Sequence, residues 1–249
     1  MKEKVLVIIP TYNEKENIRR IIPAIHKNLP DADILVVDDH SPDGTARTVT
    51  DFNDPKVFLL ERKGKLGLGT AYIAGFNWAL DKSYEYMFEM DADFSHDPED
   101  LPRLLETCKN GADVAIGSRY ISGVNVVNWP LGRIMISVGA SMYVRMITGL
   151  PVKDATAGFK CYRRTVLETI SLDKIRSIGY AFQIEMKFLA WKHGFILREI
   201  PIIFKDRTVG SSKMSGGIFG EAVWGVIRMK WNSLFRKFEK ANRKGQTEK

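Results

Sequence analysis

Short aliphatic runs alternate with helical patterns over the first sixty residues of the chain. Residues 5–9, 34–37 and 57–60 are continuous β-branched and aliphatic runs, as buried parallel strands require. Apolar residues recur at helical spacing within residues 17–25, and a second helix is expected to begin near Thr45. This β-α-β-α-β order predicts an α/β fold with a doubly wound, mostly parallel sheet flanked by helices.

Polar stretches follow the predicted strands where each strand ends. Residues 10–14 (PTYNE) follow the first strand, residues 38–45 (DDHSPDGT) follow the second, and residues 91–93 (DAD) follow a later strand at residues 86–90. Each stretch alone is compatible with a simple loop or with helix-capping acids. Because ligands of doubly wound sheets bind beyond the carboxyl ends of the strands, the three together favour a binding site there.

The two carboxylates of the DAD stretch are spaced for metal binding. Side chains alternate faces along an extended segment, so Asp91 and Asp93 are expected to project to the same side. Such a pair suits Mg²⁺ or Mn²⁺ carrying a diphosphate, because Mg²⁺ takes one or two protein carboxylates and completes its shell with phosphate and water. The alternative is a surface turn in which Asp97 caps a helix that has Pro98 in its first turn.

Composition and charge narrow the possible functions. The chain has 249 residues, long enough for one buried α/β core, and its formal net charge of +7 implies an anionic partner such as phosphate, nucleic acid or a membrane surface. Cys108 and Cys161 lie far apart in sequence and match no metal-binding spacing, which favours a reducing compartment. No secretory signal or apolar run long enough to span a membrane is expected.

Five longer stretches carry a resemblance to a known family. The stretches IIPTYNE, VVDDHSPDGT, LGLGTAYIAGF, MDADFSHDPED and GSRY resemble the family 2 glycosyltransferases, which have the GT-A fold. Arg133 and residues 117–120, 154–160, 180–185 and 206–214 are similar to the dolichol-phosphate and polyprenol-phosphate mannose synthases. The resemblance covers roughly residues 5–214.

The resemblance implies roles for individual residues. It implies a Mg²⁺ or Mn²⁺ ion on Asp91 and Asp93, with Ser95 at a third position where many relatives carry glutamine and where water is the alternative ligand. Gln183 and Glu185 are expected to support the acceptor loop. The catalytic residues implied are Asp91, Asp93 and Arg119; the nucleotide-sugar-binding residues are Pro10, Tyr12, Glu14, Val37, Asp39, Ala92, Arg207 and Lys213; and the acceptor-phosphate-binding residues are Arg119, Arg133 and Asp154.

The function implied is transfer of mannose from GDP-mannose to a polyprenyl monophosphate by metal-dependent, inverting displacement. A phosphate monoester, with a second pKa of about 6, is already largely ionised near neutral pH and needs cations for docking rather than a strong general base. Two enzymatic alternatives are a polyprenyl-phosphate glucosyltransferase that uses a UDP-sugar and a transferase with a hydroxyl acceptor. A third alternative is a nucleotide- or nucleic-acid-binding module. Against nucleic acid, the basic residues are not interleaved with an aromatic stacking platform.

A lipid acceptor requires contact with a membrane. Residues 1–217 are expected to form the catalytic domain, residues 218–238 a basic amphipathic helix on the membrane surface, and residues 239–249 a disordered polar tail. The alternative for the helix is packing on the domain or on a separate membrane-anchoring subunit. Residues 134–144 are expected to add a second apolar surface. With the function that the resemblance implies, these features lead us to expect a protein peripherally bound at the cytoplasmic face of a membrane.

Overall fold

A computed structural model describes residues 3–175, 177, 179–206 and 216–240 of the chain. Arg207 and Lys213, both predicted to bind the nucleotide sugar, lie outside the described residues. Within that part of the chain, seven strands form the main sheet in the order β3-β2-β1-β4-β7-β5-β8. The strands are β1 (Val5–Thr11), β2 (Asp33–Asp38), β3 (Val57–Glu61), β4 (Tyr86–Glu89), β5 (Val114–Ser118), β7 (Lys160–Arg163) and β8 (Leu197–Pro201).

All neighbouring strands of this sheet are parallel except β7, which runs antiparallel to both β4 and β5. The predicted mostly parallel sheet and its first four strands are therefore confirmed, with bounds within two residues of those expected. The strand order reverses direction between β1 and β4, which pair side by side. In doubly wound sheets such a switch point opens a crevice for ligands at the carboxyl ends of the strands.

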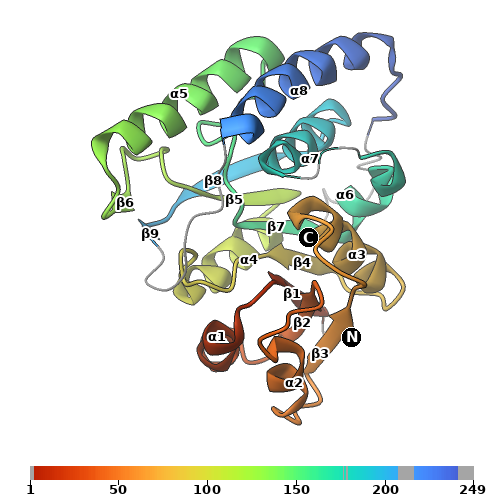
Figure 1. Ribbon diagram of the computed structural model, residues 1–249. Helices are drawn as coiled ribbons and strands as arrows, with labels where there is room; N and C mark the ends of the chain where they lie inside the picture. The colour runs from red at the N-terminus through yellow and green to blue at the C-terminus, as the bar shows by residue number, and fades with distance from the viewer. Residues whose placement is uncertain (1–2, 176, 178, 207–215, 241–249) are drawn as a thin grey trace.

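Helices cover both faces of the sheet (Figure 1). On one face, strand residues such as Val7 and Phe88 pack under helices α1 (Lys15–Asn28), α2 (Thr45–Thr50) and α4 (Leu101–Lys109). On the other face, residues such as Ile8 and Met87 pack under α3 (Leu68–Leu80), α6 (Arg164–Thr169) and α7 (Tyr180–Lys192). The strand residues alternate between these two cores, as the period of a β-strand requires.

Two long helices lie side by side beyond α7 (Figure 1): α5 (Leu131–Thr148) and α8 (Gly216–Phe235). The Tyr143 hydroxyl of α5 donates to the Val223 carbonyl of α8 at 3.0 Å. Helix α8 begins two residues before the predicted start at residue 218 and ends three residues before the predicted end at residue 238. Phe238 lies beyond the helix and packs on His193 with ring centroids 5.2 Å apart. Of the predicted tail, Glu239 accepts through its carbonyl from the His193 ring, and residues 241–249 lie outside the described residues.

Smaller elements complete the fold. A two-stranded parallel sheet joins β6 (Val126–Val127) to β9 (Phe204–Lys205), and one-turn 3₁₀ helices span η1 (Pro98–Asp100) and η2 (Leu172–Lys174). The predicted cap at Asp97 is present, because its side chain accepts from the Glu99 N–H at 3.1 Å. Among the described helices, none combines the length and apolarity that crossing a membrane requires.

Candidate active site

The loops that leave β1, β2 and β4 each contain a non-glycine residue with a left-handed backbone. Asn13, His40 and Phe94 have φ angles of 60°, 57° and 61°. Such conformations are uncommon outside glycine and gather at functional sites, where surrounding contacts hold them. Here the Asn13 N–H donates to Ser41 Oγ at 2.9 Å, so the first two loops brace each other.

The two aspartates that end β2 have different partners. Asp38 is fully buried and accepts from the Thr11 hydroxyl at 2.8 Å and from the Ser41 N–H at 2.8 Å, which ties the ends of β1 and β2 together. Asp39 forms an ion pair with Arg62, whose Nε donates to Oδ1 at 2.6 Å. Asp38 is therefore structural. Asp39 and Arg62 form a charged pair directly after the carboxyl ends of β2 and β3.

Pro10, Tyr12 and Glu14, also predicted to bind the nucleotide sugar, lie at the end of β1 and in the loop that follows it. The Tyr12 ring has the Lys65 ammonium 4.9 Å from its centroid, and the Glu14 carboxylate accepts from Asn17 Nδ2 at 2.6 Å. Pro10 is half-buried beside these residues at the end of β1. Val37 is fully buried in the core under α3, so any contact of this residue with a nucleotide is through its backbone.

Asp91 and Asp93 follow β4 on partly exposed positions, and their immediate neighbours orient them. The Tyr72 hydroxyl donates to Asp91 Oδ1 at 3.3 Å, and the Ser95 N–H donates to Asp93 Oδ1 at 3.1 Å. Ala92 between them is buried, so the loop is anchored at its centre. These contacts hold two carboxylates beside the switch point of the sheet.

This donor set fits the predicted divalent ion. Among the described residues no group of three or more His, Cys, Asp or Glu side chains is placed to hold a metal. Two hard carboxylates are nevertheless what Mg²⁺ or Mn²⁺ takes from a protein when substrate phosphate and water supply the remaining ligands. Asp91 and Asp93 would hold the ion. Ser95, predicted at a third position, is 4% exposed, and its backbone N–H donates a hydrogen bond to Asp93 Oδ1.

The buried His96 ring supports the loop that carries Asp91 and Asp93. Its Nδ1 accepts from the Asp91 N–H at 3.1 Å, and its ring stacks on Phe159 at a centroid distance of 4.8 Å and an interplanar angle of 12°. Burial lowers the pKa of His96 to about 4, so the ring is neutral at physiological pH and keeps the lone pair that accepts this hydrogen bond. The Phe204 ring meets the same imidazole edge-on at 5.7 Å.

Arg119 follows β5 and is fixed by a fully buried carboxylate. Its Nε and Nη2 donate to the two oxygens of Asp154 at 2.7 and 2.6 Å, and Nη2 also donates to the Thr156 hydroxyl. Burial alone would raise the pKa of Asp154, but the hydrogen bonds and charge of Arg119 outweigh it and the pKa is lowered. Asp154 is therefore an ionised partner of Arg119 and is poorly placed to act as a base.

Arg133 lies in the first turn of α5, near Arg119. Its Nη1 donates to Asp206 Oδ2 at 2.8 Å, and its guanidinium carbon lies 4.0 Å from the centre of the Trp129 ring. The Phe204 ring lies 5.6 Å from the Arg119 guanidinium carbon and also touches His96, so it connects the basic residues to the acidic loop.

A buried ion pair lies under the site. The Lys160 ammonium is 3.0 Å from Glu89 Oε2, both side chains are 0% exposed, and the hydrogen bond of Lys160 goes to Gln183 Oε1. The Lys187 ammonium donates to the Ala157 carbonyl at 2.7 Å. Gln183 thus accepts from Lys160, whereas Glu185 accepts from the Ser177 N–H at 3.3 Å.

Several residues of the site were missed by the sequence analysis. Arg62 directly follows β3, so its position after a strand was a usable signal of the kind that pointed to the acids. Trp129 stands in a loop without a recognisable pattern, and His96 lies within the MDADFSHDPED stretch, where only the acids and Ser95 were given roles. Glu89 and Lys160 are charged residues inside short buried strands, and their pairing depends on the antiparallel placement of β7.

Comparison with known families agrees with this geometry. The sequence model of the family described as "Glycosyl transferase family 2" matches residues 6–171, which include the loops after β1, β2, β4 and β5. The chain belongs to the family 2 glycosyltransferases. As such it is a glycosyltransferase with a GT-A-like fold, and the resemblance seen in the sequence is confirmed.

Three relatives of this family 2 glycosyltransferase are similar along most of its length. An undecaprenyl-phosphate mannosyltransferase of Micrococcus luteus is 48% identical over 237 residues, which are 93% of this chain and 97% of the relative. A polyprenol monophosphomannose synthase of Mycolicibacterium smegmatis is 47% identical over 90% of this chain and 88% of the relative. A dolichol-phosphate mannosyltransferase of Pyrococcus furiosus is 39% identical over 92% and 64%, respectively.

Solved structures extend the fold comparison. Glucosyl-3-phosphoglycerate synthase of Mycobacterium tuberculosis, solved in complex with Mn²⁺, UDP and glucosyl-3-phosphoglycerate, aligns with a TM-score of 0.67 at 15% identity and covers 92% of this chain and 79% of the other. The same enzyme with Mn²⁺, UDP-glucose and phosphoglyceric acid also gives a TM-score of 0.67 at 15% identity, with 94% and 81% coverage. At this identity the likeness supports the GT-A fold of the family 2 glycosyltransferase and nothing finer.

Proposed function

We propose that this glycosyltransferase transfers mannose from GDP-mannose to a polyprenyl monophosphate. Three relatives at 39–48% identity are named for mannosyl transfer involving undecaprenyl, polyprenol or dolichol phosphate. The site provides an acidic pair suited to a metal-bound diphosphate, Asp91 and Asp93, and an arginine pair suited to a phosphate acceptor, Arg119 and Arg133. The guanidinium fork of arginine matches phosphate oxygens in geometry as well as charge.

One observation carries the choice of a phosphate acceptor over a hydroxyl acceptor. A hydroxyl acceptor needs a general base, and a carboxylate with a pKa near the operating pH would serve. The carboxylate beside Arg119 is Asp154, which is fully buried, paired through both oxygens and lowered in pKa. Asp154 therefore holds a cation in place, and we assign it to acceptor binding through Arg119 rather than through direct contact.

The chemistry assigned to the site needs no proton transfer to or from the protein. An oxygen of the ionised acceptor phosphate forms the new bond to the anomeric carbon while the bond from that carbon to the nucleotide diphosphate breaks. A single displacement of this kind inverts the anomeric configuration. When bound, a divalent ion on Asp91 and Asp93 supplies neutralisation of the charge that develops on the leaving diphosphate.

The residues of the chain orient the two substrates for this displacement. Asp39 with Arg62, together with the loop around Tyr12 and Glu14, is assigned to the nucleotide. Arg119 and Arg133 are assigned to the acceptor phosphate, and their carboxylate partners Asp154 and Asp206 limit the net positive charge around them. Holding both reactants in place converts an encounter of two molecules into a reaction within one complex.

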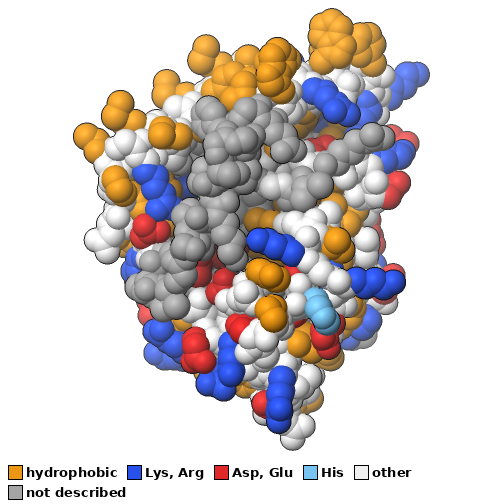
Figure 2. All heavy atoms as spheres, in the orientation of Figure 1, with side chains coloured by type: hydrophobic (Ala, Val, Ile, Leu, Met, Phe, Trp, Pro, Cys, Tyr) orange, Lys and Arg blue, Asp and Glu red, His pale blue; other side chains and the backbone are white. Residues whose placement is uncertain are grey.

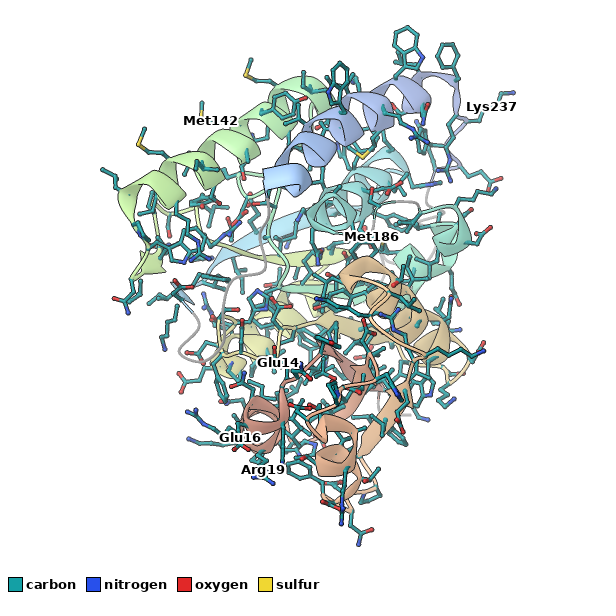
Figure 3. The ribbon with its side chains drawn as sticks, viewed as in Figure 1. Glu14, Glu16, Arg19, Met142, Met186 and Lys237 are labelled. Carbon is teal, nitrogen blue, oxygen red and sulfur yellow. The ribbon has the colours of Figure 1, made fainter. Side chains whose placement is uncertain are left out.

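A surface suited to the lipid part of the acceptor lies on α5 and α8. Large apolar side chains are exposed along the outer side of both helices, and Figure 2 shows them gathered along the upper edge of the molecule. Met142 lies on this outer side, whereas Met186 of α7 is inside the molecule (Figure 3). The most exposed members are Leu131, Met135, Met146, Trp224, Trp231, Leu234 and Phe235.

We assign this surface to the membrane interface. Apolar patches of this extent mark interaction sites, and basic residues of α8 such as Arg228 are suited to anionic headgroups. Arg133 lies in the first turn of the same helix α5, which would place the acceptor phosphate near the interface that carries its lipid. A membrane-anchoring protein subunit on the same surface is the alternative.

The proposed function is tested with purified protein, Mn²⁺ or Mg²⁺ and a panel of labelled GDP- and UDP-sugars. Label from GDP-mannose is expected to enter the organic phase when a short polyprenyl phosphate is present, and not when the matching polyprenol is supplied. Transfer from UDP-glucose to the phosphate would instead favour the glucosyltransferase alternative. Transfer to the polyprenol would contradict the assignment of the acceptor. The matched variant Arg119→Lys keeps the charge and loses the planar fork, so its transfer rate is expected to fall strongly.

A further inference from the structure

Trp129 contacts both arginines that are assigned to the acceptor phosphate. The centre of its ring lies 4.0 Å from the Arg133 guanidinium carbon and 5.6 Å from that of Arg119. The two arginines come from different elements, since Arg119 follows β5 and Arg133 belongs to α5. One aromatic side chain therefore connects two cations that the main fold positions independently.

The Trp129 ring is itself held in place. The preceding residue, Asn128, has a left-handed backbone with φ of 62°, and the following Pro130 is the N-cap residue directly before α5. The Phe204 ring of β9 packs edge-on against the indole at 5.3 Å and 73°. Because β9 pairs with β6 directly before Asn128, the small sheet fixes the aromatic ring that Trp129 packs on.

Each guanidinium is bound on one side by a carboxylate and on another by this ring. Asp154 holds Arg119 and Asp206 holds Arg133. The carboxylates fix the fork of each guanidinium, while the face of an indole attracts a cation that lies over it. Two guanidinium groups repel each other, so a shared ring is a means of keeping both near one anion before that anion arrives.

We propose that Trp129 is a positioning residue that sets the relative placement of Arg119 and Arg133 for a phosphate monoester. The inference rests on the proposed function, because that function assigns the two arginines to the acceptor. It deepens the proposal by naming the group that makes the two cations a single preorganised site. Preorganisation of this kind raises affinity by removing the cost of ordering the side chains on binding.

The test compares two variants that differ in the aromatic face. Trp129→Leu keeps an apolar side chain and loses the face, whereas Trp129→Phe keeps a smaller face. Loss of two cation–π contacts is expected to raise the acceptor KM about tenfold in Trp129→Leu. The KM for the nucleotide sugar is expected to stay within about twofold, and Trp129→Phe is expected to recover most of the acceptor affinity. If Trp129→Leu does not fold, Trp129→Met, which is also apolar and not aromatic, takes its place.

Trp78 provides a matched control far from the arginines. It lies on α3, has the Lys82 ammonium 4.3 Å from its ring centre and stacks on Tyr84 at 5.8 Å. Trp78→Leu therefore removes a half-buried indole with a cationic and an aromatic partner. It is expected to lower stability without changing the acceptor KM. Equal acceptor KM values in wild type, Trp129→Leu and Trp129→Phe would overturn the proposal, as would a parallel rise in both substrate KM values.

A binding measurement separates this proposal from the proposed function. Titration calorimetry with a short isoprenyl monophosphate, without sugar nucleotide, measures the affinity of the arginine site alone. If wild type binds the phosphate and never transfers mannose to it, the proposed function fails. In that case a tenfold weaker binding by Trp129→Leu, with recovery in Trp129→Phe, still supports the role of Trp129. Unchanged phosphate binding by Trp129→Leu contradicts the role whether or not transfer occurs.

Discussion

Removal of one partner of the buried Lys160–Glu89 pair is expected to destabilise the protein far more than removal of both. The two residues face each other across β4 and β7, with the ammonium 3.0 Å from the carboxylate and both side chains 0% exposed. A single substitution leaves a charge in the core without its partner. Such broken pairs typically cost about 3–5 kcal/mol, whereas apolar replacement of a whole buried pair is often close to neutral.

The residues around the pair determine how much stability each variant is expected to lose. Lys160 also donates to Gln183, so Lys160→Met leaves the Gln183 amide oxygen without its donor and adds about 1–3 kcal/mol. Burial lowers the pKa of Lys160 and the charge of Glu89 opposes that shift. Glu89→Met is therefore expected to cost about 3–5 kcal/mol, Lys160→Met somewhat more, and the double variant only about 1–3 kcal/mol.

Urea unfolding followed by circular dichroism and tryptophan fluorescence measures these differences at pH 7.5. Equal m-values across the four proteins are the control that the unfolded states are comparable. The double-mutant cycle is expected to give a coupling energy above about 3 kcal/mol. Additive single effects, or a cost below about 1 kcal/mol for Lys160→Met, would refute the reasoning that this pair is buried and mutually dependent.

Three further predictions address the metal, the membrane surface and pH. Asp93→Asn is expected to abolish Mn²⁺-dependent transfer, whereas the control Asp97→Asn, at the cap of η1, keeps it; retained activity in Asp93→Asn would reject the metal assignment. Replacing Trp231 and Phe235, which are 63% and 76% exposed, by serine is expected to weaken sedimentation with anionic vesicles at least tenfold at unchanged Tm, since each buried aromatic contributes about 1.5–3 kcal/mol. Unchanged sedimentation would favour a protein partner instead. The pKa of His96, about 4 when folded, lies below its unfolded value of about 6.5, so its contribution to stability is complete above pH 6.5 and is lost as pH falls toward 4. The free energy of unfolding of the metal-free protein should fall by about 2 kcal/mol between pH 7.5 and 5, and His96→Gln should reduce this pH dependence. An equal dependence of the free energy of unfolding on pH in both proteins would contradict the assignment.

The part of the fold that could be predicted is the part that local periodicity of apolar residues determines. Continuous apolar runs gave the strands β1 to β4, and the polar residues after them indicated the edge of the sheet at which the site lies. The order of strands beyond β4 was not predictable in this way. The antiparallel strand β7 enters between β4 and β5, and that pairing is decided by contacts between residues distant in the chain.

The sequence pointed to the charged residues Asp91, Asp93 and Arg119, but not to the residues that hold them in place. Asp91 and Asp93 stand out because two acids one residue apart follow a buried strand, and Arg119 was found through a resemblance over several motifs. The support given by His96 and Trp129 depends on the packing of aromatic rings from separate elements. Such packing produces no regular spacing of residues that could be recognised in the sequence. The burial of Val37 follows from its place in the β2 core, which the motif resemblance did not take into account.

The central claim is that the acceptor atom is an oxygen of a phosphate monoester. It is tested most directly by ³¹P NMR of a short polyprenyl phosphate during incubation with the protein, GDP-mannose and Mg²⁺. The monoester signal, which shifts with pH around its second pKa of about 6, is expected to be replaced by a pH-independent phosphodiester signal as GDP is released. A monoester signal that stays unchanged while GDP is released would contradict the claim.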